Sequence, residues 1–319
     1  MNDDHGPAAR GRHITICEVG PRDGFQSEER FIPTDEKIAI VDAMFAAGLR
    51  QIQVTSFVSP RAVPQLADAE EVLARISRPE GASVSGLVAN RKGAERAVGA
   101  GVDFVHGVLS ASETHNRKNV NRPIDASLSE MEEVAAILAQ GGVALEGGIA
   151  TAFGCPFEGE VPAEQVGRIA RRYQEMGAMR VSLGDTTGMA TPVTVAAAIS
   201  AIRDAAPGLE IGLHFHNTRG VGLACVMTGL SLGVTHYDAS IGGLGGCPFA
   251  AGATGNICTE DLVYLLEESG YATGVDLQAI IAVAERTQET LGRPLPGQVM
   301  KAGPRLRRYD PDATRTAAG

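Results

Sequence analysis

Short runs of β-branched and other apolar residues alternate along the chain with longer stretches in which apolar residues recur at helical spacing. This alternation is typical of βα units that build a parallel sheet. Eight runs predict strands: His13–Glu18, Gln51–Thr55, Ser83–Val88, Phe104–Val108, Leu145–Ala150, Arg180–Gly184, Gly212–His216 and His236–Ser240.

The first segment between strands shows the helix signals. Thr34 can cap the helix, Ile38, Val41 and Phe45 recur on one face, and Gly48 ends it. Similar signals predict further helices over Leu128–Gln140, Ala163–Met176 and Val193–Ala205. Eight strands with intervening helices predict an α/β fold, a closed (β/α)8 TIM barrel, although the counts also fit a doubly wound open sheet.

The length of 319 residues and a hydrophobic content of 44% fit one barrel domain. Residues 1–12 lack an apolar core and carry acidic side chains, so we expect a disordered N-terminal lead and no signal peptide. From residue 293 to 319 the composition turns to Pro, Gly, Arg and Thr, which predicts a short C-terminal tail. The TIM-barrel catalytic domain is therefore expected over residues 13–292.

Charge and cysteine usage exclude several classes of function. The formal net charge is −10, whereas nucleic acids and anionic membranes favour basic patches, so we expect neither as a partner. The chain has no run of about 18 apolar residues, as a membrane-spanning helix requires. The five cysteines are odd in number and widely spaced, which indicates reduced thiols and a cytoplasmic protein.

Paired histidines mark the end of the seventh predicted strand, in the segment LHFHNTRG. His214 and His216 share one face of a strand, while Phe215 points the opposite way. TIM barrels build their active sites at the carboxyl ends of the strands. A lone histidine is more often structural, but a pair at this end favours metal ligation.

The segment EVGPRDGFQ follows the first predicted strand. Pro21 and Gly24 are typical of a tight loop, which would present Arg22 and Asp23 at the mouth of the barrel. A carboxylate beside two imidazoles suits Mg²⁺, Mn²⁺ or Co²⁺ better than a structural zinc site. Taken alone, an Arg-Asp pair in a loop is usually a surface ion pair.

Two further segments reach the same rim. SIGGLGGCPFAAGATGN contains six glycines around Cys247 and ends at Asn256, so it could bind phosphate, close over a substrate, or be only a flexible connection. QVTSFVSP places Gln53, Thr55 and Ser56 at the end of the second strand. Their hydroxyls could instead serve only to cap the next helix.

These motifs resemble those of 3-hydroxy-3-methylglutaryl-CoA lyases, TIM-barrel metallolyases with an Arg-Asp loop after the first strand. The likeness covers residues 14 to 302 and includes EVGPRDGFQ, TSFVSPRAVPQLAD, SLGDTTG, HFHNT and GGLGGCPFAAGATGN, in that order. The resemblance implies cleavage of the CoA thioester to acetyl-CoA and acetoacetate through an enolate. It also implies a homodimer and a divalent cation, Mg²⁺ or Mn²⁺, with Co²⁺ or Zn²⁺ as alternatives.

Roles for individual residues follow from the resemblance. The implied metal ligands are Asp23, His214, His216 and Asn256. Arg22 would stabilise the enolate, and either Asp23 or His214 would take the hydroxyl proton. Cys247, on a mobile loop, would protonate the released enolate or exclude water. Residues expected to contact the substrate or support the site are Gln26, Gln53, Thr55, Ser56, Asp185, Thr186, Asn217, Gly245 and Gly246.

Four positions depart from the family pattern. Gln53 stands where these lyases usually have Glu, Asn217 and Arg219 replace Asp and Tyr, and Glu29 replaces Lys. A lyase for citramalyl-CoA or another branched 3-hydroxyacyl-CoA is therefore an alternative. A Claisen-type synthase is a weaker one, because GLGGCP replaces the Gly-Glu-Arg turn of such synthases. A non-catalytic barrel that binds acyl-CoA or a protein would be expected to lack a metal ligand, and none is missing.

Overall fold

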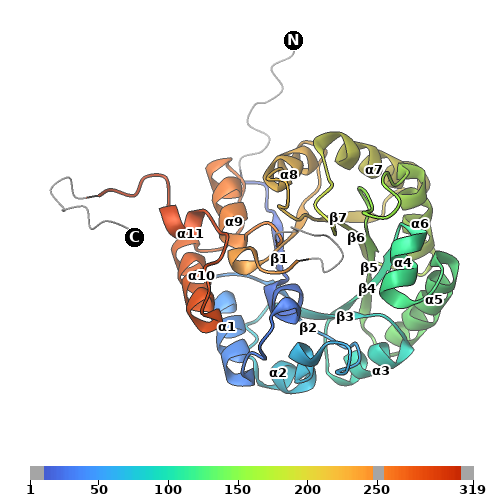
Figure 1. The fold of residues 1–319 in the computed structure, drawn as a ribbon, viewed down its shortest axis with the longest axis horizontal. Helices are drawn as coiled ribbons and strands as arrows, with labels where there is room; N and C mark the ends of the chain where they lie inside the picture. Colours follow the sequence, from blue (N-terminus) through green and yellow to red (C-terminus); the bar gives the residue numbers. More distant parts are fainter. Residues whose placement is uncertain (1–10, 247–254, 310–319) are drawn as a thin grey trace, which may run out of the picture.

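The computed structural model describes residues 11–246 and 255–309. Eight parallel strands form one closed barrel in sequence order, and helices surround it (Figure 1). β1 pairs with both β2 and β8, which confirms the TIM barrel and excludes the open sheet. The strands are β1 (Thr15–Glu18), β2 (Gln51–Ser56), β3 (Ser83–Val88), β4 (Phe104–Ser110), β5 (Ala144–Ala150), β6 (Arg180–Gly184), β7 (Glu210–His214) and β8 (His236–Ala239).

Six of the eight predicted strands differ from those in the structure by one or two residues at an end, and three of the six extend too far. Three of the residues predicted in β1, β7 and β8 lie outside these strands, namely His13, His216 and Ser240. Each pairs through a single β-bridge with a residue of a loop or a later segment. For His216 the reason is that β6 ends at Gly184, the partner of His214, so β6 offers no further partner in the ladder. His216 pairs instead with Asn256.

Helices cover the outside of the barrel, and no described helix is long and apolar enough to cross a membrane. The bounds are α1 (Thr34–Ala46), α2 (Ala69–Arg75), α3 (Arg91–Gly99), α4 (Glu113–Val120), α5 (Ile124–Gln140), α6 (Ala163–Glu175), α7 (Pro192–Ala205), α8 (Gly222–Ser231), α9 (Thr259–Glu268), α10 (Leu277–Leu291) and α11 (Val299–Ala302). The predicted cap at Thr34 is wrong. Pro33 holds the N-cap position, and the Thr34 hydroxyl donates to Asp68 Oδ2 at 2.8 Å.

Apolar side chains fill the layer between the strands and the helices, and Tyr173 of α6 illustrates the packing. Its ring is fully buried against Gly147 of β5, where any Cβ would overlap the ring atoms. The Tyr173 hydroxyl donates to the Gly107 carbonyl at 2.8 Å, so the polar end of this ring has a partner inside the core. The four described cysteines are buried and form no disulfide.

The residues that follow α10 pack on the barrel. Gly292 ends this helix with a left-handed φ of 67°, and Leu295 is buried against Gly242. The Asp261 carboxylate accepts the N–H groups of Gln298 and Val299, which attaches this extension to α9. The division of the chain at residue 292 stays a prediction. Residues 1–10 of the expected lead lie outside the described part.

Candidate active site

The two histidines at the end of β7 direct their rings to the same place. The distance between His214 Nε2 and His216 Nε2 is 3.3 Å, and the ring centroids lie 5.3 Å apart. Phe215 points the other way, is fully buried, and packs against Phe153 with ring centroids 5.8 Å apart. The two imidazoles therefore converge, as the spacing predicts.

Asp23 reaches the histidines from a tight turn after β1. The turn η2 (Gly20–Gly24) is a single π-helical turn, in which the N–H of Asp23 donates to the Val19 carbonyl at 2.7 Å. The close packing requires Gly24, because a Cβ there would lie 2.6 Å from Leu244 Cβ. Metal-binding atoms of Asp23, His214 and His216 lie within 4.8 Å of one another.

Asn256 completes the group from the segment after β8. Its backbone forms the bridge to His216, and its side-chain Nδ2 donates to Asp23 Oδ2 at 2.7 Å. Gly245 lies against both side chains with φ +99°. A Cβ at this position would be 2.5 Å from Asn256 Nδ2 and 2.9 Å from Asp23 Oδ2. The glycine-rich segment can therefore approach the site this closely only because residue 245 is a glycine and has no Cβ.

The chemistry of these four residues fits a divalent cation. Two imidazole nitrogens, a carboxylate and an amide oxygen match the preferences of Mg²⁺, Mn²⁺ and related ions. Burial opposes ionisation of Asp23, but Arg22 and the two histidines outweigh it and hold the pKa of this carboxyl at about 2. Asp23 is therefore ionised at neutral pH, as a metal ligand must be.

Cys258, Glu260 and Asp261 form a second group of potential ligands, but they serve the fold. The Glu260 carboxylate accepts the Gly242 N–H at 3.0 Å, and Asp261 binds the backbone after α10. Burial raises the pKa of Cys258, so its sulfur stays protonated at neutral pH. A protonated thiol is a poor metal ligand.

Arg22 lies between Asp23 and Gln53. Its Nε donates to Gln53 Oε1, and its Nη1 forms an ion pair with Asp23 Oδ1. Gln53 is buried at 3% exposure on β2, and Gln26 Nε2 donates to Asp23 Oδ1 at 3.1 Å. The structure thus brings Gln26 and Gln53 together with the arginine–aspartate pair.

Asp238 of β8 also belongs to the site and was not predicted from the sequence. Its Oδ2 lies 3.0 Å from His214 Nδ1 and accepts a bond from Ser182 Oγ at 3.2 Å. Burial alone would lower the pKa of His214, but the bond to Asp238 outweighs it and the pKa is raised. The available signal was an acidic residue near the carboxyl end of the eighth strand, two residues after His236 and therefore on the same face.

Glu18 was also missed. This fully buried carboxylate at the end of β1 accepts the N–H of Gly20 at 2.7 Å, the N–H of Ile241 at 2.9 Å, and the Thr259 hydroxyl. One side chain therefore joins the turn that carries Arg22 to the segment that follows β8. The signal in the sequence was an acidic residue at the carboxyl end of the first predicted strand.

Other predicted residues support the backbone of the rim. Asp185 Oδ1 accepts the N–H groups of Met189 and Ala190 at 2.7 and 2.9 Å, and burial raises the pKa of this carboxyl to about 7. Thr186 Oγ1 accepts the Thr151 N–H at 2.9 Å. These two residues stabilise the segments after β5 and β6.

The remaining predicted residues lie at the rim of the barrel, apart from one that is not among the described residues. Ser56 is buried and its hydroxyl accepts the Val58 N–H at 3.3 Å, so it holds the loop after β2. Thr55 is buried beside it. Asn217 Oδ1 accepts the Gly222 N–H at 3.2 Å at the start of α8. Gly246 follows Gly245 in the described chain, whereas Cys247 lies outside it.

Comparison with known proteins agrees with this geometry. Residues 13–286 match the model of the family described as HMGL-like. The chain belongs to this family. The hydroxymethylglutaryl-CoA lyase YngG of Bacillus subtilis is 42% identical over 287 residues, covering 90% of this chain and 96% of that protein.

Two further relatives of this HMGL-like protein are similar to the same degree. The (R)-citramalyl-CoA lyase of Chloroflexus aurantiacus is 41% identical over 302 residues, covering 91% of this chain and 95% of that protein. An HMG-CoA lyase of Acinetobacter baumannii, solved with coenzyme A and 3-methylmalate, superposes with a TM-score of 0.88 at 43% identity, covering 93% and 97%. Overall sequence identity to these relatives therefore does not indicate which acyl group the substrate carries.

The positions at which this HMGL-like chain departs from the family pattern differ in their surroundings. Gln53 contacts Arg22 directly. Arg219 uses Nη1 to bind the carbonyls of Thr187 and Gly188 at 3.0 and 2.6 Å, which joins the loops after β6 and β7. Glu29 is exposed on the segment before α1. Of these, Gln53 is the one beside the predicted catalytic residues.

Proposed function

We propose that this chain is a metal-dependent carbon–carbon lyase that cleaves 3-hydroxy-3-methylglutaryl-CoA to acetyl-CoA and acetoacetate through an enolate. The observation that carries the proposal is the convergence of Asp23, His214 and His216 beside Arg22. The hydroxymethylglutaryl-CoA lyase of B. subtilis, at 42% identity, supports the choice of substrate.

The cation would be held by Asp23, His214, His216 and Asn256, and Mg²⁺ or Mn²⁺ suits this mixed set, with Co²⁺ or Zn²⁺ as alternatives. When bound, such an ion lowers the pKa of the substrate C3 hydroxyl and orients it. Asp238 would hold the His214 ring so that Nε2 faces the ion.

Asp23 is the better candidate for taking the hydroxyl proton. An imidazole that ligates through Nε2 and donates from Nδ1 to Asp238 has no lone pair left to accept a proton. The Asp23 carboxylate accepts bonds from Arg22, Gln26 and Asn256, which leaves one of its about four acceptor positions for the ion. Asp23 can take the proton by giving up one of these bonds, so we assign this step to Asp23 and a ligand role to His214.

Arg22 would stabilise the enolate oxygen as the carbon–carbon bond breaks. Its contacts to Gln53 and Asp23 use Nε and Nη1, which leaves further guanidinium N–H groups for a substrate oxygen. Because Gln53 and Asp23 fix the guanidinium before substrate binds, little reorganisation accompanies the appearance of charge. A role for Cys247, either in protonating the enolate or in excluding water, also belongs to the proposal and rests on the resemblance alone.

A panel of CoA thioesters assayed with Mg²⁺ and Mn²⁺ tests the function. We expect metal-dependent release of acetyl-CoA from 3-hydroxy-3-methylglutaryl-CoA, and a large loss in a His216→Ala variant that still folds. Cleavage that persists after complete chelation would contradict the metal site. We also propose a cytoplasmic homodimer, which sedimentation equilibrium of the full chain and cell fractionation would test.

Citramalyl-CoA cleavage is the second candidate, and Gln53 favours it. With Oε1 used by Arg22, the amide leaves Nε2 as a donor for a substrate carbonyl or carboxylate, which a glutamate would repel. If Gln53 selects the acyl group, Gln53→Glu should change the ratio of kcat/KM for the two thioesters by about tenfold or more. A ratio unchanged within about twofold, with metal still bound, would favour the 3-hydroxy-3-methylglutaryl-CoA assignment.

A further inference from the structure

Three ionisable side chains that the proposed reaction does not use lie side by side inside the barrel. The strand register pairs His106 of β4 with Glu146 of β5, and Glu146 with Arg180 of β6. The residues that alternate with the first two, Gly107 and Gly147, face the helices, because a Cβ there would lie 3.0 Å from a side chain of α5 and 2.4 Å from one of α6. His106 and Glu146 therefore point into the barrel.

Glu146 is the centre of this group. Arg180 Nε donates to Glu146 Oε1 at 2.8 Å, and Glu146 Oε2 lies 3.8 Å from His106 Nδ1. Burial opposes ionisation of Glu146, but His106 and Arg180 outweigh it and lower the pKa of this carboxyl. Glu146 is therefore ionised at neutral pH. It faces Nδ1 of the imidazole and leaves Nε2 on the other side of the ring.

Gly148 makes room for the His106 ring. A Cβ at this glycine would lie 2.4 Å from His106 Nε2 and 2.9 Å from its Cε1. The imidazole therefore occupies the space that a side chain at position 148 would fill. Any residue other than glycine would displace the ring.

His106 lies at the depth of the residues that support the candidate site. Interior side chains of a TIM barrel form layers from alternate strands, and the tilt of the strands shifts the level by about one residue per strand. The register then puts His106 level with Ser182 and Asp238, which are bonded at 3.2 Å. Gly148 lies one layer nearer the mouth, level with His214. Because His106 Nε2 points to Gly148, it reaches the level of the predicted metal ligands.

The His106 ring is open to the mouth of the barrel. Its side chain is 11% exposed, whereas Glu146 and Arg180 below it are buried. Within residues 11–246 and 255–309, the contact to Glu146 is the only polar contact of His106, so Nε2 has no partner there. An imidazole nitrogen in this position is available to a substrate.

The acyl group of a substrate would lie between two walls of the barrel. Figure 1 shows β4 and β5 across the barrel from β1, after which Arg22 and Asp23 follow. With the thioester at Arg22 and the C3 hydroxyl at the metal ligands, the remaining chain on C3 faces His106. In the proposed substrate this chain ends in a carboxylate. An imidazole between that carboxylate and Glu146 is favoured in its protonated form, in which both nitrogens donate.

We propose that His106 Nε2 binds the terminal carboxylate of the acyl group and so selects acyl-CoA substrates that carry one. Glu146 and Arg180 hold the ring in place, and Gly148 provides its space. The proposal rests on the proposed acyl-CoA lyase function and names the residue that reads the acyl end of the substrate.

Two thioesters that differ only in this carboxylate test the proposal. They are 3-hydroxy-3-methylglutaryl-CoA and 3-hydroxy-3-methylbutyryl-CoA. His106→Ala should lower kcat/KM for the first about 30-fold, because a charge-assisted hydrogen bond is lost, and should leave the second within about threefold. His106→Gln should keep the first within about fivefold of the wild type, since its amide nitrogen can donate near the position of Nε2.

Gly148→Ala tests the position of the ring. In the wild type it should lower kcat/KM for 3-hydroxy-3-methylglutaryl-CoA about tenfold, because the added Cβ displaces His106 Nε2. In the His106→Ala background no ring is left to displace, so the same change should stay within about twofold. His236→Gln is the control, since this histidine begins β8, at the end of the barrel away from the site, and should leave both thioesters within about twofold.

Several results would overturn the proposal. An unchanged kcat/KM for 3-hydroxy-3-methylglutaryl-CoA in a folded His106→Ala variant, or an equal loss for both thioesters, would limit His106 to a structural role. Additive effects of Gly148→Ala and His106→Ala would contradict the contact between the two positions. If His106→Ala does not fold, Gly148→Ala alone decides, because it leaves all three polar side chains in place.

Two further arms separate this proposal from the proposed function. Citramalyl-CoA carries its carboxylate directly on C3, so a loss for this thioester in His106→Ala would assign the shorter acid to the same residue. If the wild type cleaves no thioester, the lyase function is refuted. Calorimetry then decides the subsite: the wild type should bind 3-hydroxy-3-methylglutaryl-CoA more tightly than 3-hydroxy-3-methylbutyryl-CoA, and His106→Ala should abolish the difference. Equal affinities in the wild type would refute the role of His106.

Discussion

Replacement of Asp238 by asparagine is the sharpest test of the proposed metal site. The Asp238 carboxylate accepts a bond from His214 Nδ1 at 3.0 Å, and the two side chains are only 15% and 12% exposed. Charge and geometry here hold the proton on Nδ1 and leave Nε2 free to ligate. Asp238→Asn keeps the shape but removes the charge, and its amide can donate to Nδ1 and move the proton to Nε2.

The expected loss follows from this geometry. Removing the partner that orients a ligating histidine typically costs about 10–100-fold in metal affinity, or about 1.4–2.7 kcal/mol. The low exposure of both side chains places Asp238→Asn toward the upper end of this range, because water replaces a buried partner poorly. The activity should fall in parallel at limiting metal and recover in part at saturating metal.

Titration of the metal-free protein with Mn²⁺, followed by calorimetry, gives the dissociation constant directly. Ser182→Ala is the matched control, since it removes the other partner of the same Oδ2 atom at 3.2 Å and leaves the charge. We expect its affinity for Mn²⁺ to stay within about threefold of the wild type. A well-folded Asp238→Asn variant that binds Mn²⁺ within twofold of the wild type would refute the reasoning.

Three other substitutions test separate parts of the structure. Arg22→Gln should lower kcat by about 10²–10³ with little change in KM, and an unchanged kcat with a raised KM would limit Arg22 to binding. Gly245→Ala should weaken metal binding at least about tenfold in a titration. At φ +99° the added Cβ would lie 2.5 Å from Asn256 Nδ2 and 2.9 Å from Asp23 Oδ2. A metal affinity equal to that of the wild type would show that the glycine-rich segment moves to make room for the Cβ. Burial raises the pKa of Glu260 from 4.5 to about 8, so the folded state keeps a proton that the unfolded state loses above about pH 4.5. The free energy of unfolding should therefore fall as the pH rises from about 4.5 to 8. The wild type should lose up to about 1.4 kcal/mol per pH unit more than the Glu260→Gln variant, and an equal dependence on pH in the two proteins would contradict this.

Much of the architecture could be predicted from local pattern. All eight strands are present near their expected positions, because alternation of apolar runs and helical periods depends on neighbouring residues alone. The spacing of His214 and His216 determines that they share a face of any strand. Asp23 was placed at the barrel mouth by its loop, and Asn256 was identified as a ligand by resemblance. The structure brings both to the histidines, although their role as ligands stays a prediction.

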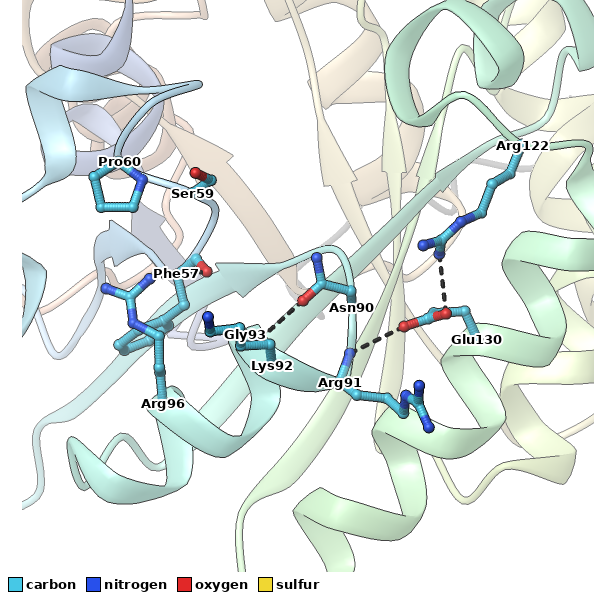
Figure 2. Close-up of a pocket in the computed structure, with 10 residues that line it drawn as sticks. All are labelled: Phe57, Ser59, Pro60, Asn90, Arg91, Lys92, Gly93, Arg96, Arg122 and Glu130. Carbon is cyan, nitrogen blue, oxygen red and sulfur yellow. Dashed lines mark hydrogen bonds and ion pairs between the residues drawn. The ribbon is translucent and has the colours of Figure 1, made fainter.

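The contacts that could not be predicted from the sequence join residues far apart in the chain. Glu18 bonds to Thr259 across 241 positions, and the Asp238 carboxylate meets His214 only because β7 and β8 pair in one particular register. A cavity of about 360 Å³ beside the start of α3 likewise needs the loop after β2, α3, Arg122 and Glu130 in one place (Figure 2).

The sequence alone therefore determined the approximate positions of the strands and of four helices, and the face shared by His214 and His216, since these depend on φ, ψ and side-chain period within a few residues. The tertiary structure decided closure of the barrel, the bond between Asp238 and His214, and the burial that raises or lowers each pKa. The reason is that strand register and burial result from packing over the whole chain, and no local segment contains that information.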